Sequence, residues 1–273
     1  MSIEIKSPQE VQAIAAAGRV LDTIIEDVIL REVKPGVTTA EIEARVHEMI
    51  LARGGEPVLR GYTQAGVGSG GAPFPGSACV CVNEEVVHAV PSTRIVRAGD
   101  LLTVDVAMRY RGWCIDTAWS VAVRDVASNA PCTRAESLQT TAADVLRTAR
   151  HMMKPGTRWS TIAAACQQLV ASRGMHFVHG YCGHGIGHNL HESPRVSFTS
   201  KDWSKSGEDF TLWPGMVLCV EPIVCEGTNQ AALTTLDDGW TVITNDRRWT
   251  AHEEECVVTT IEGARVLAGA GQY

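Results

Sequence analysis

The sequence predicts an α+β protein of two similar halves, each built from helices and antiparallel strands, with a site between them. Three observations predict this architecture. Helical and strand-like segments follow one another along the chain, the sequence around residues 34–54 returns in altered form at 154–174, and one hairpin carries two acidic residues. Because cavities form where two such halves meet, we expect the functional site there.

The composition is that of a globular chain large enough to bury a substantial core, since 45% of its 273 residues are hydrophobic. The net charge of −7 argues against nucleic acid or an anionic membrane surface as the main partner. No apolar run approaches the roughly 18 residues of a membrane span, and the first residues lack the apolar region of a secretory signal. Nine cysteines without a Cys-x-x-Cys pair favour free thiols in a reducing cytoplasm.

Two helices open the chain. Ser7 and Glu10 have the spacing of a capping box, and apolar residues then recur at helical intervals, which predicts a helix over 8–31. A second helix follows the cap at Thr38 and ends at Gly54.

Strands follow a loop over 61–77 that is rich in Gly, Pro and Ser. Short β-branched segments predict strands at 79–83 and 86–90. Two longer segments, beginning at 101 and 113, predict an antiparallel hairpin.

The hairpin carries Asp105 on one strand and Asp116 on the other. If its turn is centred on Tyr110 and Arg111, these residues lie directly opposite each other, with Cβ atoms roughly 4.5–5.5 Å apart. Two carboxylates so close are unfavourable unless a cation lies between them, so one or two metal ions are the economical explanation. The alternative is that one Asp caps a turn and the other is solvated, and a three-residue loop would separate the pair.

The first half of the chain is partly repeated in the second. A motif before a helix, a motif at its end, and a glycine six positions before an acid all recur. The pairs are Lys34-Pro35-Gly36 and Lys154-Pro155-Gly156, Arg53-Gly54 and Arg173-Gly174, and Gly99/Asp105 and Gly215/Glu221. Shared helix-end chemistry could produce the first match alone, but the matching acid favours duplication. We expect one domain over 1–273 with an internal duplication of roughly 8–125 and 130–262.

The second half has its own polar residues. Three histidines, His184, His188 and His191, lie within eight residues among glycines that argue against a helix, which excludes a zincin-type His-Glu-x-x-His site. The alternative is a mobile surface loop with incidental histidines. Glycines around a histidine also let the backbone and a ligand approach closely.

Further acids follow two apolar strands. Glu221 ends the strand over 216–220, where a buried carboxylate needs a cation partner; a strand end in water is the alternative. In the run 253–255, alternation places Glu254 on one face and its neighbours on the other, without saying which face is the site. Four carboxylates and one or two histidines suit Mn, Fe, Co or Zn, and bridging carboxylates suggest two ions.

Together these segments resemble the type I methionine aminopeptidases of the pita-bread fold, in which helices cover the outer faces of two pseudo-symmetric halves of antiparallel sheet. The residues that carry the resemblance are 82–88, Asp105, Asp116, 182–187, 220–222 and 251–254. The resemblance implies that two divalent ions (Co, Mn, Fe or Zn) are held by Asp105, Asp116, His184, Glu221 and Glu254. It also implies that His88 and His191 contact the substrate and that His88, His191 and Glu221 are catalytic.

The implied reaction is removal of the N-terminal methionine, by hydroxide held between the metals, from new proteins whose second residue is small. The implied methionine pocket is lined by Phe74, Cys79, Leu190 and Trp240, with Tyr62 as a weaker candidate. The glycine-rich loop before Phe74, and Val87 and Ala89 beside His88, depart from the family pattern and put the shape of this pocket in doubt. The implied partners are nascent polypeptide N-termini near the ribosome, with no nucleic acid and no membrane, for a cytoplasmic monomer.

Two other functions compete with this one. A proline-specific aminopeptidase or dipeptidase shares the fold but usually carries an extra N-terminal domain, for which we expect no room before Thr38. A non-catalytic binding relative would typically have lost ligands, whereas all five positions here hold competent side chains. The 37 positions from His184 to Glu221 leave no room for the type II insertion, and Met1-Ser2 predicts that the enzyme processes itself.

Overall fold

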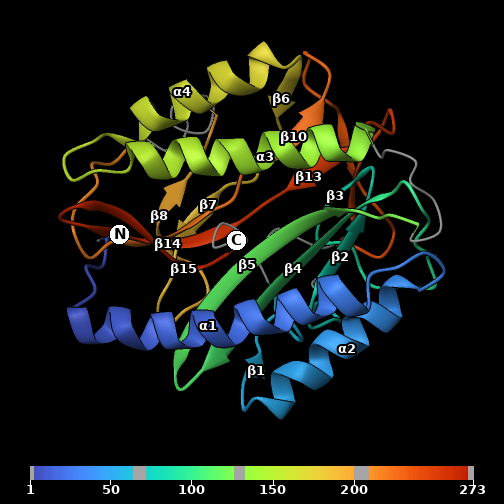
Figure 1. Cartoon of the computed structure of the whole chain (residues 1–273), viewed down its shortest axis with the longest axis horizontal. Helices are drawn as coiled ribbons and strands as arrows, with labels where there is room; N and C mark the ends of the chain where they lie inside the picture. Colours follow the sequence, from blue (N-terminus) through green and yellow to red (C-terminus); the bar gives the residue numbers. More distant parts are fainter. Residues whose placement is uncertain (1–2, 64–71, 126–132, 200–208, 270–273) are drawn as a thin grey trace.

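The computed structural model describes residues 3–63, 72–125, 133–199 and 209–269; Met1, Ser2 and most of the glycine-rich loop before Phe74 lie outside these ranges. Within these ranges, four helices lie in two pairs on either side of the strands (Figure 1). They are α1 (Pro8–Arg31), α2 (Thr39–Ala52), α3 (Thr133–Met152) and α4 (Trp159–Ser172). Among the described residues, no helix has both the length and the apolarity that a membrane crossing requires.

The strands of the described residues form four antiparallel sheets. The first has the order β1-β4-β2 with β5 on β4, and the largest has the order β15-β14-β9-β7-β8; the small sheets are β13-β10-β6 and β11-β12-β3. The strands of the first half are β1 (Glu56–Pro57), β2 (Cys79–Val82), β3 (Glu85–Val87), β4 (Leu101–Tyr110) and β5 (Trp113–Ala122). Those of the second half are β6 (Met175–Phe177), β7 (Gly183–Gly185), β8 (Glu192–Val196), β9 (Val217–Val220), β10 (Ile223–Glu226), β11 (Leu233–Thr235), β12 (Val242–Thr244), β13 (Thr250–His252), β14 (Glu255–Thr260) and β15 (Gly263–Ala268).

The helix predictions from capping chemistry are confirmed. Ser7 and Glu10 form both hydrogen bonds of a capping box, and α1 has the predicted bounds. Thr38 and Glu41 cap α2 in the same way. The strands β2 and β3 are each shorter than predicted, because Asn83 (φ 57°) and His88 (φ 55°) turn the backbone out of the extended conformation.

The predicted register of the acidic hairpin is wrong by two residues. Asp105 pairs with Ala118, and Asp116 pairs with Ala107. The turn is the two-residue Arg111-Gly112, with φ values of 51° and 86°, as expected for a tight hairpin that matches the strand twist. A shift of two keeps both carboxylates on one face, now diagonal to each other and not directly opposite.

The two halves repeat the same local structure. Helices α2 and α4 are offset by 120 residues at both ends. The Gly36 N–H donates to the Val96 carbonyl at 2.9 Å, and the Gly156 N–H donates to the Leu212 carbonyl at 2.8 Å. Both glycines have positive φ, 99° and 85°, which closes the turn before each helix.

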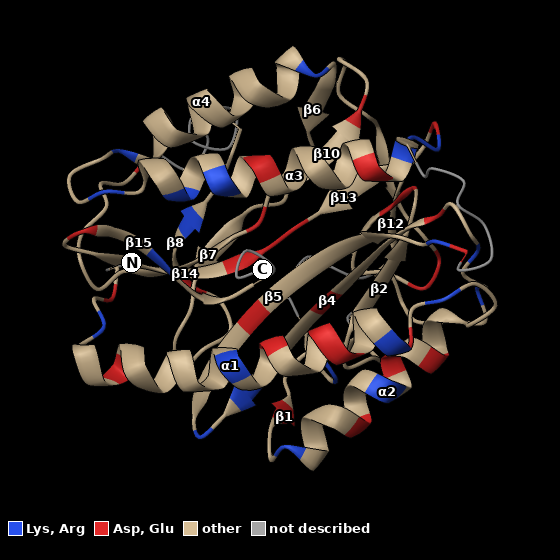
Figure 2. Ribbon diagram, in the orientation of Figure 1, with Lys and Arg blue, Asp and Glu red and all other residues tan. Residues whose placement is uncertain are grey.

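Two large apolar cores lie beneath the two pairs of helices. One lies beneath α1 and α2 and includes Ile14 and Val104, and the other lies beneath α3 and α4 and includes Leu138 and Trp159. Acidic positions occur on β4 and β5 in the middle of the molecule as well as on the outer helices (Figure 2). The acids on β4 and β5 therefore differ from those on the helices, because they lie inside the molecule.

Candidate active site

One cavity of about 470 Å³ lies between the two halves and gathers nearly all of the residues singled out in the sequence. Its lining includes ten of them: Phe74, Cys79, His88, Asp105, Asp116, His184, His191, Glu221, Trp240 and Glu254. Four of them come from β2, β4, β5 and β7, and the others come from segments next to β2, β3, β8, β9, β12 and β14. Leu190 is the exception: it lies in a second cavity of about 480 Å³.

Three carboxylates meet at the floor of the first cavity. One oxygen each from Asp105, Asp116 and Glu254 lies within 4.8 Å of the others. The position of Glu254 is fixed by its backbone, because its N–H donates to the Ala118 carbonyl at 2.8 Å and its carbonyl accepts from the Thr117 hydroxyl at 2.8 Å. The segment before β14 is thereby held against β5, which brings an acid of the second half beside two acids of the first.

The electrostatics of this cluster favour a bound cation. Loss of water around the carboxylate raises the pKa of Asp105 to about 6. Burial, followed by repulsion from neighbouring carboxylates, raises the pKa values of Asp116 and Glu254 well above their usual range. Asp116 Oδ1 and Glu254 Oε1 are buried without a hydrogen-bond partner among the described residues. A divalent cation is the partner that such a set of oxygens fits.

His184 presents its Nε2 atom to the carboxylates. Its Nδ1 atom lies 2.9 Å from the Gly185 carbonyl oxygen, which can only accept, so Nδ1 carries a proton and Nε2 is the nitrogen that faces the carboxylates. Nε2 is 3.9 Å from Asp116 Oδ2 and 3.8 Å from Glu221 Oε1. A neutral imidazole in this tautomer is the form that binds a metal ion.

The glycines beside His184 allow this placement. A Cβ atom at Gly183 would lie 2.1 Å from the Cys219 carbonyl oxygen, and one at Gly185 would lie 2.2 Å from the Ser193 carbonyl oxygen. Only glycine therefore lets β7 fit closely between its neighbouring backbones. The glycines of this segment predicted a close approach of backbones, and the structure requires glycine at both Gly183 and Gly185 for this reason.

His252 is a site residue that the sequence analysis missed. It is 3% exposed, lines the cavity, and places Nε2 3.6 Å from Glu221 Oε2. Burial alone would raise the pKa of Glu221, but His252 and His184 outweigh it and lower that pKa. Burial alone would lower the pKa of His252, but Glu221 and Asp105 outweigh it and raise that pKa. Strand alternation could have found His252, because it lies two residues before Glu254.

His88 and His191 are neutral imidazoles at neutral pH. Burial lowers the pKa of each to about 4. His191 Nδ1 is 2.7 Å from the Tyr62 hydroxyl, and its ring lies edge-on to that of His184 with centroids 4.3 Å apart. His88 lies 6.2 Å from Trp240 between ring centroids. Both imidazoles therefore border the metal-binding groups and the apolar part of the cavity.

The apolar part of the cavity is formed by Phe74, Cys79 and Trp240. The rings of Phe74 and Trp240 meet edge to face with centroids 5.4 Å apart, and Trp240 Nε1 donates to the Ala72 carbonyl at 3.0 Å. Tyr62 lies between the two cavities and lines both. Further lining residues that were not predicted from the sequence are Leu59, Tyr181, Ser193 and Arg195.

Comparisons with known proteins agree with this geometry. A model of metallopeptidase family M24 matches residues 12–260. The chain is 32% identical to methionine aminopeptidase 1 of Bacillus subtilis, covering 96% of this chain and 97% of that protein. It superposes on methionine aminopeptidase from Thermotoga maritima with a TM-score of 0.83 at 31% identity, covering 98% of this chain and all of that one. Xaa-Pro dipeptidase from Bacillus anthracis shares the fold, with a TM-score of 0.70 at 19% identity, and this chain covers 63% of it.

The family model spans almost the whole chain, and the Bacillus subtilis relative matches it over nearly its full length. The predicted pita-bread architecture, with antiparallel sheets and helices outside them, is confirmed. The chain belongs to metallopeptidase family M24, in its methionine aminopeptidase branch.

Proposed function

We propose that this protein hydrolyses the first peptide bond of polypeptides that begin with methionine and continue with a small residue. The observation that carries the proposal is that four carboxylates and one imidazole from both halves line one cavity together with an apolar pocket. The Bacillus subtilis and Thermotoga maritima relatives, both named methionine aminopeptidases, support the same reaction.

The donor set would hold two divalent cations. Asp105, Asp116 and Glu254 would hold one, while His184 and Glu221 would complete the second position with carboxylates shared between the two. Oxygen and imidazole donors suit Mn, Fe, Co or Zn. When bound, such ions polarise the scissile carbonyl and lower the pKa of a water molecule beside it.

His88, His191 and Glu221 would orient the substrate and move protons. Each neutral imidazole can donate one hydrogen bond and accept another. The Tyr62 hydroxyl holds His191 at Nδ1, which leaves Nε2 for the scissile peptide. Glu221 stays ionised because its pKa is lowered, so it can accept the proton of the attacking water and pass it to the leaving amine as the C–N bond breaks.

The methionine side chain would lie against Phe74, Cys79 and Trp240. These residues offer an apolar surface beside His88, with soft sulfur–aromatic contacts for a thioether. Leu190 lies beside the neighbouring cavity instead, where it would support His191 without touching the methionine. A small second residue fits because the imidazoles and the carboxylates leave little width at the scissile bond.

The partners would be the N-termini of nascent polypeptides near the ribosome. The cytoplasm is where such N-termini are made, and we therefore place the enzyme there. We propose a monomer as the working form.

The proposal is tested by comparing three peptides on the metal-loaded protein. Met-Ala-Ser should release free methionine, and Ala-Pro-Ser should remain intact, with products identified by mass spectrometry. Met-Leu-Ser should be cleaved at least about tenfold more slowly, because discrimination by a narrow pocket is typically worth 1–3 kcal/mol. Cleavage of the proline peptide alone would make the protein a proline-specific relative instead.

A further inference from the structure

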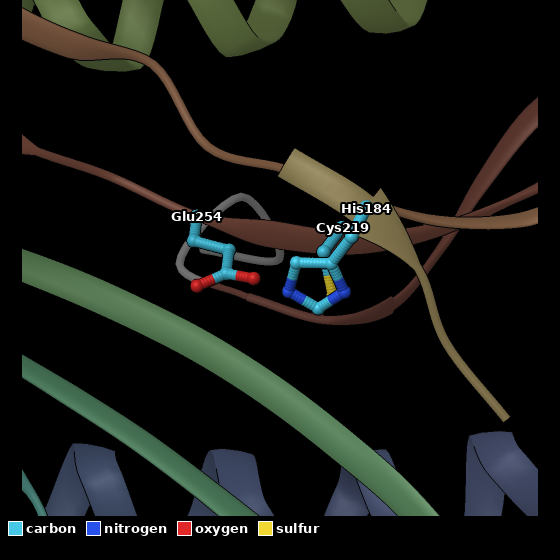
Figure 3. Close-up of side chains that lie close together, drawn as sticks. All are labelled: His184, Cys219 and Glu254. Atoms are coloured by element: carbon cyan, nitrogen blue, oxygen red, sulfur yellow. The ribbon is translucent and has the colours of Figure 1, made fainter. Parts of the chain in front are cut away.

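The metal-binding cluster contains a thiol that neither the sequence analysis nor the proposed function uses. Cys219 Sγ, one ring nitrogen of His184 and one carboxylate oxygen of Glu254 all lie within 4.8 Å of one another, and all three side chains are buried. Figure 3 shows the three side chains gathered on the same side of the strands that carry them.

The sheet register explains why the thiol faces the site. Cys219, in the middle of β9, pairs with His184 of β7 on one side and with Cys256 of β14 on the other. Paired residues of an antiparallel sheet point to the same face, so the Cys219 and His184 side chains are direct neighbours. Glu221, two residues after Cys219, shares that face by alternation. The pairing and alternation of the strands therefore place the thiol next to His184 and Glu221 on one face of the sheet.

Two donor groups share Glu254. Asp105, Asp116 and Glu254 offer only oxygen atoms, whereas His184, Cys219 and Glu254 offer nitrogen, sulfur and oxygen. Carboxylate oxygens suit Mn²⁺, while imidazole and thiolate favour Zn²⁺ and other softer ions. The two positions of the centre thus differ in chemical character.

We propose that Cys219 is a further ligand of the ion on the His184 side, which makes that position selective for zinc over manganese. The inference rests on the proposed metal centre and adds to it one soft thiolate ligand at the position on the His184 side. Zinc binds sulfur at about 2.3 Å and nitrogen or oxygen at about 2.0–2.2 Å, so small side-chain rotations suffice to close the cluster around one ion. The thiol proton is released to solvent when the ion binds.

X-ray absorption at the zinc edge tests this directly on the full chain loaded with zinc. We expect a sulfur neighbour at about 2.3 Å from the metal in the wild-type protein. The signal should disappear in Cys219→Ser and persist in Cys256→Ser, the matched control, because Cys256 pairs with Cys219 but lies outside both donor groups.

Three results would overturn the inference. A wild-type spectrum with only nitrogen and oxygen neighbours would reduce Cys219 to a hydrogen-bond donor to Glu254. A sulfur signal lost in Cys256→Ser and kept in Cys219→Ser would assign the wrong thiol. Binding of manganese without any binding of zinc would contradict the zinc selectivity. Failure to bind Mn, Fe, Co and Zn alike would instead refute the metal centre itself, and so is distinguishable from these three results.

Competition between zinc and manganese gives a second readout that does not depend on peptide hydrolysis. Cys219→Ser should lower the ratio of zinc to manganese affinity on the order of tenfold, since one soft donor is exchanged for a hard one. An unchanged ratio would contradict the proposed selectivity, even in a variant that folds and binds metal normally.

Discussion

At the scale of single residues, the site consists of carboxylates that repel each other until a cation lies among them. The raised pKa values of Asp116 and Glu254, caused first by burial, and their unpartnered oxygens mean that the metal-free centre stores unfavourable energy. Binding of a cation removes this penalty, so metal affinity contributes to folding stability.

We expect Asp116→Asn to abolish most of the stabilisation that metal gives the wild-type protein. A bound ion adds about 2.7 kcal/mol at 100 times its Kd, and the variant lacks a ligand for it. In chelator, the variant should be no less stable than wild type, because one repelling charge has gone. Thermal unfolding with and without zinc measures both effects, with the exposed Asp246→Asn as control. An equal zinc-induced rise in the Asp116 variant would contradict this account.

Residue chemistry was only partly predictable from the sequence. Alternation separated Glu254 from its neighbours, and the family resemblance then selected it as a ligand; the structure places it among the other acids. The same alternation puts His252 on that face, but its contact with Glu221 depends on two strands that are far apart in sequence. Leu190 shows the opposite: a plausible pocket residue that the backbone carries into the neighbouring cavity.

At the scale of elements, local chemistry determined what could be predicted. The helices α1 and α2 begin at capping boxes, whose hydrogen bonds join residues three apart, and their bounds were predicted well. The hairpin register depends on which two residues form the turn, and an error of one turn position changed the pairing of Asp105. Because the register differs by an even number of residues, the prediction that Asp105 and Asp116 share a face of the hairpin was right. The prediction that they pair directly was wrong.

The contact between α1 and β15 gives a prediction of its own. Alanine normally stabilises a helix by about 1 kcal/mol relative to glycine. At Gly18, however, a Cβ atom would lie 1.8 Å from the Leu267 carbonyl oxygen. We therefore expect Gly18→Ala to destabilise the protein by roughly 1–3 kcal/mol, as overpacking does. Urea unfolding measures this against Arg19→Ala, an exposed neighbour on α1; a gain in stability for Gly18→Ala would show that α1 does not pack this closely.

The same two elements make stability depend on pH through Asp22. It is 8% exposed and accepts a hydrogen bond from the Gly269 N–H at 2.8 Å, and burial raises its pKa to about 6. The folded protein then holds this proton more tightly than the unfolded chain, so stability falls as pH rises from about 4 to about 6. Above that range the charged form costs up to about 3 kcal/mol.

Asp22→Asn should therefore be more stable than wild type at pH 7 by about 1–3 kcal/mol and no more stable at pH below about 4. The amide oxygen can still accept from Gly269, so only the charge is removed. Urea unfolding in chelator at both pH values is the measurement, with the exposed Asp237→Asn as control. A difference that is the same at both pH values would contradict a role for the Asp22 charge.

At the scale of the whole molecule, the cavity exists because two halves of similar construction meet. The matching turns at Gly36 and Gly156, and the equal bounds of α2 and α4 after an offset of 120, support our proposal that one catalytic domain arose by duplication. The repeat was visible in sequence because it uses local turn motifs. The full set of side chains that border the cavity was less visible, because Tyr181, Glu192 and Arg195 line it without belonging to a recognisable motif.

The central claim is that acids of both halves hold divalent metal and that this metal is needed to release methionine. The most direct measurement is free methionine released from Met-Ala-Ser by chelated protein as Mn, Fe, Co or Zn is added back separately. We expect no release from the metal-free wild type, recovery with at least one of these ions, and no recovery for Asp105→Asn at the same metal concentrations. Full release by metal-free protein, or by the Asp105 variant, would contradict the claim.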